Sequence, residues 1–118
     1  MRQGKRAGFS RSERLLKRHQ FLAVSRRGRK VQDACFIVYY RPGGTDNPRL
    51  GVTVSRRVGN AVTRNRVKRV IREFFRNNRH LLEGNWDLNV IAKPAASGLT
   101  AQEAAVSLNR LFSKCKAG

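Results

Sequence analysis

Apolar side chains recur along the chain with two spacings, one typical of helices and one typical of strands. Three segments carry apolar residues every three or four positions, and three shorter segments are rich in β-branched and aromatic residues. Gly28 follows the first helical segment, whereas Asn60 and Thr100 precede the other two, as helix ends favour. The pattern predicts helices over residues 18–27, 61–77 and 101–114, and strands over residues 34–41, 50–55 and 87–92.

The segment between the first two predicted strands favours a reversal of the chain. Residues 42–48 combine proline, glycine, asparagine and aspartate, and such a segment between two strands predicts a β-hairpin. Side chains of the first strand alternate between two faces, with Cys35, Ile37 and Tyr39 on one and Phe36, Val38 and Tyr40 on the other.

The predicted helix over residues 61–77 is the most informative segment. Its apolar residues fall on one stripe, formed by Val67, Val70, Ile71, Phe74 and Phe75. The opposite face carries Asn65, Arg69, Arg72 and Arg76, with Arg66 on one flank and Arg64 and Lys68 on the other. A solvated face normally mixes acids with bases, but Glu73 is the only acid here. The pattern therefore favours binding to an anionic partner, and Arg56 and Arg57 extend the same surface.

The net charge supports this interpretation. The 118 residues include 26 Lys or Arg against 7 Asp or Glu, a formal charge of +19. The excess lies in two blocks, with eleven bases and two acids in residues 1–33, and nine bases and one acid in residues 54–80. An anionic partner such as nucleic acid would relieve the self-repulsion of so many like charges.

A membrane surface is the weaker alternative for the anionic partner. No apolar run approaches the roughly 20 residues of a spanning helix, and no signal-peptide core follows the first charges. We expect a cytoplasmic protein without an obligate protein partner, in which Cys35 and Cys115 are free thiols and Cys35 is a core residue. The length fits one domain over residues 12–118, preceded by a basic flexible tail over residues 1–11.

The segment from Val52 to Glu73 resembles the signature of the bacterial ribonuclease P protein component, with Arg64-Asn65-Arg66 at its centre. Similar stretches at residues 14–21 together with 26–28, at residues 87–94 and at residues 109–112 extend this resemblance over nearly the whole chain. The resemblance implies a small two-layer α/β (α+β) sandwich of αβββαβα order, similar to ribosomal proteins, with a split β-α-β unit and a left-handed crossover. It also implies that the protein joins a catalytic RNA and assists endonucleolytic removal of the 5′ leader from precursor tRNA.

The same resemblance assigns two sets of contacts. The catalytic RNA would be contacted by Arg56, Arg57, Asn60, Arg64, Asn65, Arg66, Lys68, Arg69 and Arg72. The unpaired leader would lie between the first helix and the sheet, against Phe21 and Tyr39, with Phe36 as a third candidate. Core packing is the alternative for these rings, and it is favoured for Phe36. Two positions stand out: Ser25, where the family often has an aromatic residue, and Asn89, in an otherwise apolar strand.

A catalytic site within the protein finds no support in the sequence. No two carboxylates form a close pair within a motif, His19 and His80 lie far apart, and no metalloprotease, P-loop or nucleophile motif is present. The resemblance implies that the RNA performs the hydrolysis with Mg²⁺ bound mainly by the RNA itself, and we expect no metal to be held by the protein alone. Charge alone leaves two alternatives open, a ribosomal or other structural RNA-binding protein and a nonspecific DNA-compacting protein.

Overall fold

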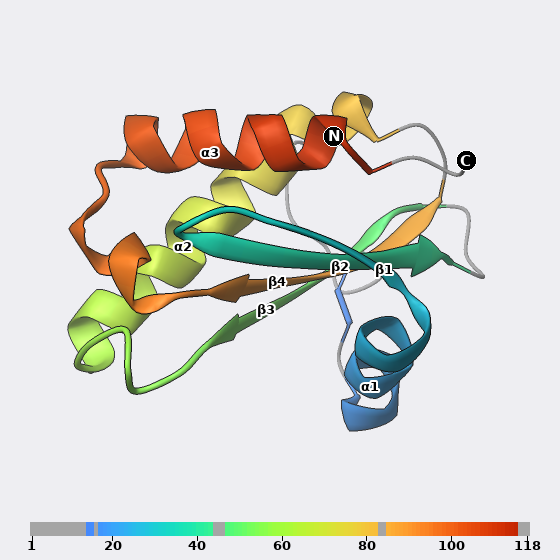
Figure 1. The fold of residues 1–118 in the computed structure, drawn as a ribbon, viewed down its shortest axis with the longest axis horizontal. Helices are drawn as coiled ribbons and strands as arrows, with labels where there is room; N and C mark the ends of the chain where they lie inside the picture. The colour runs from blue at the N-terminus through green and yellow to red at the C-terminus, as the bar shows by residue number, and fades with distance from the viewer. Residues whose placement is uncertain (1–13, 16, 44–46, 83–84, 116–118) are drawn as a thin grey trace, which may run out of the picture.

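The chain runs through a helix, three strands, a second helix, a fourth strand and a third helix (Figure 1). The computed structural model describes residues 14–15, 17–43, 47–82 and 85–115. Its elements are α1 (Arg18–Arg27), β1 (Arg29–Gln32), β2 (Phe36–Pro42), β3 (Arg49–Val54), α2 (Ala61–Asn78), η3 (Arg79–Leu81), β4 (Trp86–Ala92), η4 (Pro94–Gly98) and α3 (Ala101–Ser113), where η denotes a 3-10 helix. The αβββαβα order is confirmed, whereas the predicted tail over residues 1–11 lies outside the described residues.

The strands form a mixed sheet in the order β1-β2-β4-β3. β2 is antiparallel to both β1 and β4, and β3 runs parallel to β4. The predicted hairpin between the strands now seen as β2 and β3 is wrong, because β4 lies between them. β4 is buried at every position except Ile91, as expected for a strand paired on both edges and covered on both faces. α2 connects β3 to β4, and the left hand of this crossover stays a prediction.

The hairpin that the structure contains joins β1 to β2 instead. Asp33 stabilises its turn, because Oδ1 accepts hydrogen bonds from the backbone N–H groups of Cys35 at 2.8 Å and Phe36 at 2.9 Å. Oδ2 accepts a hydrogen bond from the Ser107 hydroxyl on α3. Burial alone would raise the pKa of the Asp33 carboxyl, but these hydrogen bonds lower it below its usual value. Sequence reasoning missed β1 because three of its four residues are polar and exposed.

The sheet has one face covered by α2 and α3 and another covered by α1 (Figure 1). The predicted alternation along β2 is confirmed, since Phe36, Val38 and Tyr40 are buried on the α2–α3 side and Ile37 and Tyr39 are half-buried on the α1 side. Between α2 and α3, the rings of Phe74 and Phe112 meet edge to face with centroids 5.1 Å apart. The main core therefore lies between the sheet and these two helices, and the α1 side is left partly accessible.

The two cysteines are free thiols, as predicted. Cys115 is buried after the end of α3, and burial raises the pKa of its thiol to about 12. Cys35 is half-buried and packs against the margin of the core rather than within it, because it lies in the turn before β2.

Candidate RNA interface

The turn that leads into α2 brings three of the predicted RNA contacts together. Asn60 caps the helix, with its Oδ1 accepting a hydrogen bond from the Thr63 backbone N–H at 2.9 Å. Gly59 has φ of +157°, and a Cβ there would lie 2.9 Å from Thr63 Cγ2, so glycine suits this turn. Arg56 and Arg57 are exposed beside it. These residues lie in the turn just before the helix N-terminus, whose unpaired N–H groups add partial positive charge.

The predicted stripe along α2 is confirmed, because Val67, Ile71, Phe74 and Phe75 are buried and Val70 is half-buried against the core. On the outside, Asn65, Arg69 and Arg72 are exposed, and Arg64 and Lys68 are half-exposed. No Lys or Arg of α2 forms an ion pair with a carboxylate among the residues that the structure describes. The cations of this face therefore have no ion-pair partner within that part of the protein.

Arg66 differs from its neighbours on α2. Its Nη2 donates to the Ser97 carbonyl oxygen at 2.7 Å, and its Nη1 donates to the Leu99 carbonyl oxygen at 3.3 Å. The guanidinium therefore joins α2 to the end of η4. Sequence reasoning assigned Arg66 to RNA alone and could not have found this role, because the carbonyl groups belong to a segment far along the chain.

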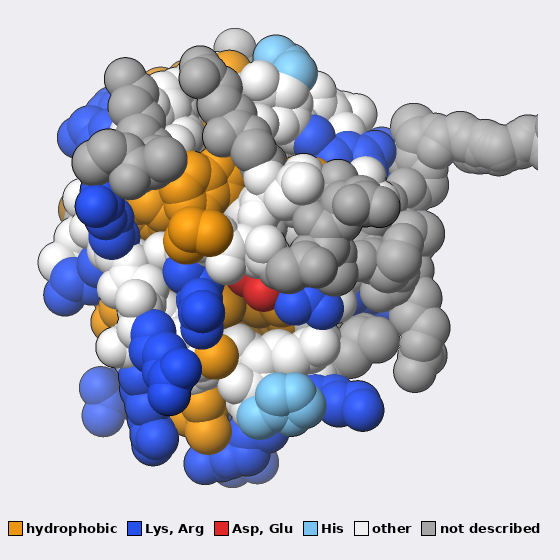
Figure 2. Space-filling view, turned by 90° about the vertical axis from the view of Figure 1, so that its right-hand side faces the viewer, with side chains coloured by type: hydrophobic (Ala, Val, Ile, Leu, Met, Phe, Trp, Pro, Cys, Tyr) orange, Lys and Arg blue, Asp and Glu red, His pale blue; other side chains and the backbone are white. Residues whose placement is uncertain are grey.

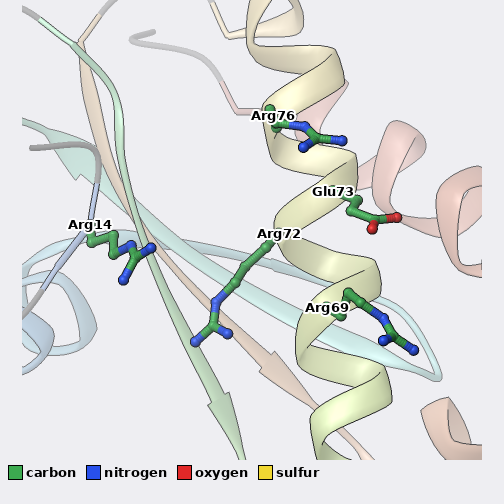
Figure 3. Close-up of a pocket in the computed structure, with 5 residues that line it drawn as sticks. All are labelled: Arg14, Arg69, Arg72, Glu73 and Arg76. Carbon is green, nitrogen blue, oxygen red and sulfur yellow. The ribbon is translucent and has the colours of Figure 1, made fainter. Parts of the chain in front are cut away.

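A cavity of about 320 Å³ lies beside α2, lined by Arg14, Arg69, Arg72, Glu73 and Arg76. Figure 3 shows Arg14 and Arg72 reaching toward each other from the chain before α1 and from α2. Arg14 is held there by a backbone bridge to Leu50 of β3. Arg76, which the helical spacing placed toward solvent, is half-buried, and its Nε has no hydrogen-bond partner. Four arginines and one glutamate line this cavity, and this excess of positive charge suits a phosphate group.

The predicted leader contacts lie on the α1 side of the sheet. Phe21 is half-buried with its ring over Gly51 of β3, where a Cβ would lie only 2.4 Å from Phe21 Cε1. Tyr39 on β2 is also half-buried, and one strand, β4, separates it from Gly51. Phe36 is different, because it is 1% exposed on the opposite face and offers no ring surface to a base. We therefore count Phe36 as a core residue and leave it out of the leader contacts.

Buried polar groups also occupy the α1 side of the sheet. Arg49 donates two hydrogen bonds to Asp87, at 2.9 and 2.8 Å, and this interaction raises the pKa of the Arg49 guanidinium. Asn89 is 4% exposed and contacts Thr53 and Ser25, so it faces α1 rather than an edge of the sheet. The two unusual positions of the sequence, Ser25 and Asn89, thus lie in contact with each other.

A second group of exposed cations lies at the end of α1 and on β1, formed by Arg26, Arg27, Arg29 and Lys30. Figure 2 shows that Lys and Arg side chains far outnumber Asp and Glu side chains on one face of the molecule. The basic block of residues 1–33 was a signal for this group, but sequence reasoning assigned none of its basic residues to RNA. Arg14 was missed in the same way.

This chain is similar to known ribonuclease P proteins. The family model for ribonuclease P matches residues 9–116. The ribonuclease P protein component of Desulfatibacillum aliphaticivorans is 47% identical over 93% of each chain, and that of Desulforapulum autotrophicum is 48% identical over 90% of this chain and 91% of its own.

Solved structures of ribonuclease P proteins also resemble this chain. The ribonuclease P protein from Thermotoga maritima matches with a TM-score of 0.81 and 32% identity, over 89% of this chain and 99% of its own. The Staphylococcus aureus protein matches with a TM-score of 0.79 and 34% identity, over 85% of this chain and 92% of its own. These matches decide against the ribosomal and DNA-compacting alternatives. The chain belongs to the family of bacterial ribonuclease P protein components, and it is the protein subunit of the endoribonuclease that processes the 5′ end of precursor tRNA.

Proposed function

We propose that this subunit binds two RNAs with two different faces. The α2 face, which comprises the exposed side of α2 and residues 56–60, contacts the catalytic RNA of ribonuclease P. The leader face, which comprises α1 and the sheet surface beneath it, holds the single-stranded 5′ leader of the precursor. Together the two faces bring the substrate to the ribozyme, and the RNA performs the hydrolysis.

The cations of α2 that lack ion-pair partners support the proposed contact with the catalytic RNA. Arg69 and Arg72 are exposed on one face, without ion pairs to described carboxylates, and like charges at this spacing destabilise an isolated helix. RNA phosphates would remove that cost and release counterions on binding. The arginine-lined cavity next to this face offers a seat for a phosphate.

Two half-buried rings support the second half. Phe21 and Tyr39 are half-buried and lie outside the main hydrophobic core cluster, so part of each side chain remains accessible to a ligand. Unpaired bases expose their ring faces and can stack on such side chains, whereas bases within a duplex cannot. A surface of this kind therefore suits a single-stranded leader better than the folded body of a tRNA.

The RNA subunit is better suited than the protein to bind metal ions. Among the described residues, no three His, Cys, Asp or Glu side chains come together in a way that could hold a metal ion. A chain with a net charge of +19 also repels divalent cations, which RNA phosphates attract. We assign the Mg²⁺ ions of the reaction mainly to the RNA subunit, and no step of the hydrolysis to a protein side chain.

The structure describes no helix that combines the length and the apolar character needed to cross a bilayer. We place the assembly in the cytoplasm, because that is where bacterial precursor tRNA is transcribed and processed.

The α2 face is tested by the salt dependence of binding to the catalytic RNA. Arg72→Ala should weaken binding and reduce the slope of log affinity against log salt by about 0.7 to 0.9 for each phosphate that the variant no longer neutralises. Arg110→Ala, which removes an exposed arginine from α3, is the matched control and should leave the slope nearly unchanged. Equal changes of slope for the two variants would show that α2 contributes only general charge.

The leader face is tested by comparing precursor with mature tRNA. Phe21→Ala should weaken holoenzyme binding to the precursor by about 5- to 100-fold, the range expected when one base has no ring to stack on, and leave mature tRNA unaffected. Leu22→Ala, at the next position of α1 and also half-buried, is the control. Equal weakening for both tRNAs would mean that Phe21 only supports the packing of α1.

A further inference from the structure

Three polar side chains form a connected row beneath α1. The Thr53 hydroxyl donates to Asn89 Oδ1 over 3.1 Å, and Asn89 Nδ2 donates to Ser25 Oγ over 3.5 Å. Asn89 lies in the middle of β4, paired in register with Tyr39 on one side and Gly51 on the other. A buried amide costs stability unless its polar atoms find partners, so the row is stable only as a unit.

The chemistry of these groups fixes the direction of each hydrogen bond. An amide oxygen cannot donate, so Thr53 gives its hydroxyl proton to Asn89. An amide nitrogen cannot accept, so the oxygen of Ser25 receives a proton from Asn89. The hydroxyl proton of Ser25 is then available to a further acceptor, and within the described part of the chain it donates to no residue.

The position of Ser25 places this proton at the proposed leader face. Ser25 is half-buried and lies one helical turn after Phe21, and its partner Asn89 is adjacent to Tyr39. A nucleotide stacked on either ring would bring its base edge close to the hydroxyl. A neutral hydroxyl beside aromatic rings suits a base edge better than a phosphate, which the arginines of α2 attract more strongly.

We propose that Ser25 donates a hydrogen bond to an acceptor atom on one leader base and thereby determines a nucleotide preference in the leader. Asn89 and Thr53 are positioning residues, which hold the Ser25 oxygen so that its proton points toward the leader. This inference rests on the proposed leader-binding function, and it adds the chemical character of one contact. The polar row also accounts for the two unusual positions together, because the Ser25 oxygen accepts a hydrogen bond from the buried amide of Asn89.

The test uses the reconstituted holoenzyme and precursor tRNAs that carry each of the four nucleotides at each leader position in turn. We expect the wild-type protein to show, at one leader position, a preference of about 3- to 10-fold in kcat/KM, the range of one neutral hydrogen bond. Ser25→Ala should abolish this preference, and Ser25→Thr, which keeps a hydroxyl, should retain it.

Thr53→Val tests the positioning role separately. Thr53 is exposed and the change is nearly isosteric, so the variant should still fold, although it loses some stability because the buried oxygen of the Asn89 amide loses its hydrogen-bond donor. The amide also loses the bond that fixes its orientation. The preference at the same leader position should fall, although Thr53 itself is not proposed to contact the leader. A preference that is unchanged in Thr53→Val would overturn the positioning role.

Two other outcomes would overturn the inference and are distinguishable. A wild-type holoenzyme that favours precursor over mature tRNA, but shows no preference that Ser25→Ala removes, contradicts the role of Ser25 and leaves the leader face intact. A wild-type holoenzyme that binds precursor and mature tRNA alike contradicts the leader face itself.

Discussion

Neighbouring arginines on α2 differ in what they contact. Arg66 donates to the carbonyl oxygens of Ser97 and Leu99, whereas Arg69 is exposed and Arg76 has a buried Nε without a partner. Arginine content alone therefore does not define the RNA contacts. Loss of Arg66 should affect folding, and loss of Arg69 should affect binding.

Arg66→Ala should lower the free energy of unfolding by about 1 to 3 kcal/mol, because two backbone carbonyls lose a charged donor. Urea unfolding measures this effect in the free protein. Arg69→Ala is the matched control on the same helix and should stay within about 0.5 kcal/mol of the wild type. Similar stability of the two variants would contradict the structural role of Arg66.

Cys115 should make stability depend on pH in the alkaline range. Its thiol pKa is raised to about 12 in the folded protein, so the unfolded chain loses this proton first as the pH rises. This contribution to stability is fully present below the pKa of an unfolded cysteine, near 8.5, and is lost progressively up to about pH 12, with a slope of at most about 1.4 kcal/mol per pH unit. The difference in the free energy of unfolding between wild type and Cys115→Ala, measured with urea from pH 7 to pH 10, separates the effect of this thiol from that of the other ionisable groups. A difference that does not change with pH would contradict the assignment.

At the scale of elements, the ends of the helices follow from local signals, and the pairing of the strands does not. Asn60 and Thr100 bond to backbone N–H groups three residues on, so the sequence placed the starts of α2 and α3 correctly. The cationic face of α2 was equally predictable, because helical spacing is local. β4 lies between β2 and β3 in the sheet because helices from distant parts of the chain cover both of its faces. Local sequence signals do not show this, and they therefore suggested a hairpin between β2 and β3 that is wrong. The placement of Arg14 depends on its bridge to β3 and was missed for the same reason.

Two substitutions of Asn60 should separate capping from RNA binding. Asn60→Ala should lower stability by about 1 kcal/mol, because the Thr63 N–H loses its partner. Asn60→Asp retains a cap and should preserve stability, but it places a negative charge among Arg56, Arg57 and the helix N-terminus. Binding to the catalytic RNA should therefore weaken in Asn60→Asp while the urea midpoint stays close to the wild type. Unchanged RNA affinity in Asn60→Asp would remove this end of α2 from the interface.

The packing of α1 on β3 should control the leader face. In Gly51→Ala the new methyl group would overlap the Phe21 ring, so α1 has to shift and about 1 to 3 kcal/mol of stability should be lost. Precursor binding should weaken more than binding to the catalytic RNA. Gly98→Ala is a suitable control, because a Cβ there meets no atom within 4 Å. Equal loss of both RNA affinities in Gly51→Ala would indicate general unfolding rather than a local change.

At the scale of the molecule, the sheet divides a small domain with a formal charge of +19 into two sides, which we propose bind different RNAs. α2 and α3 cover one side and enclose the main core, and α2 turns its cations outward from it. α1 covers the other side only in part, so Tyr39 and Thr53 of the sheet remain at least partly accessible beside it. This arrangement would let the subunit bind the ribozyme and the unpaired leader at the same time, as we propose.

The most direct test of this account is the cleavage of a precursor tRNA by bacterial ribonuclease P RNA at low magnesium concentration, with and without the protein. The protein should restore cleavage at the 5′ end of the tRNA, because its positive charge and the proposed leader contacts would take over part of the charge neutralisation that Mg²⁺ provides at higher concentration. Arg72→Ala should require a higher protein concentration for the same rate, and Phe21→Ala should require a higher precursor concentration. Cleavage that is no faster with the wild-type protein than without it would contradict the central claim.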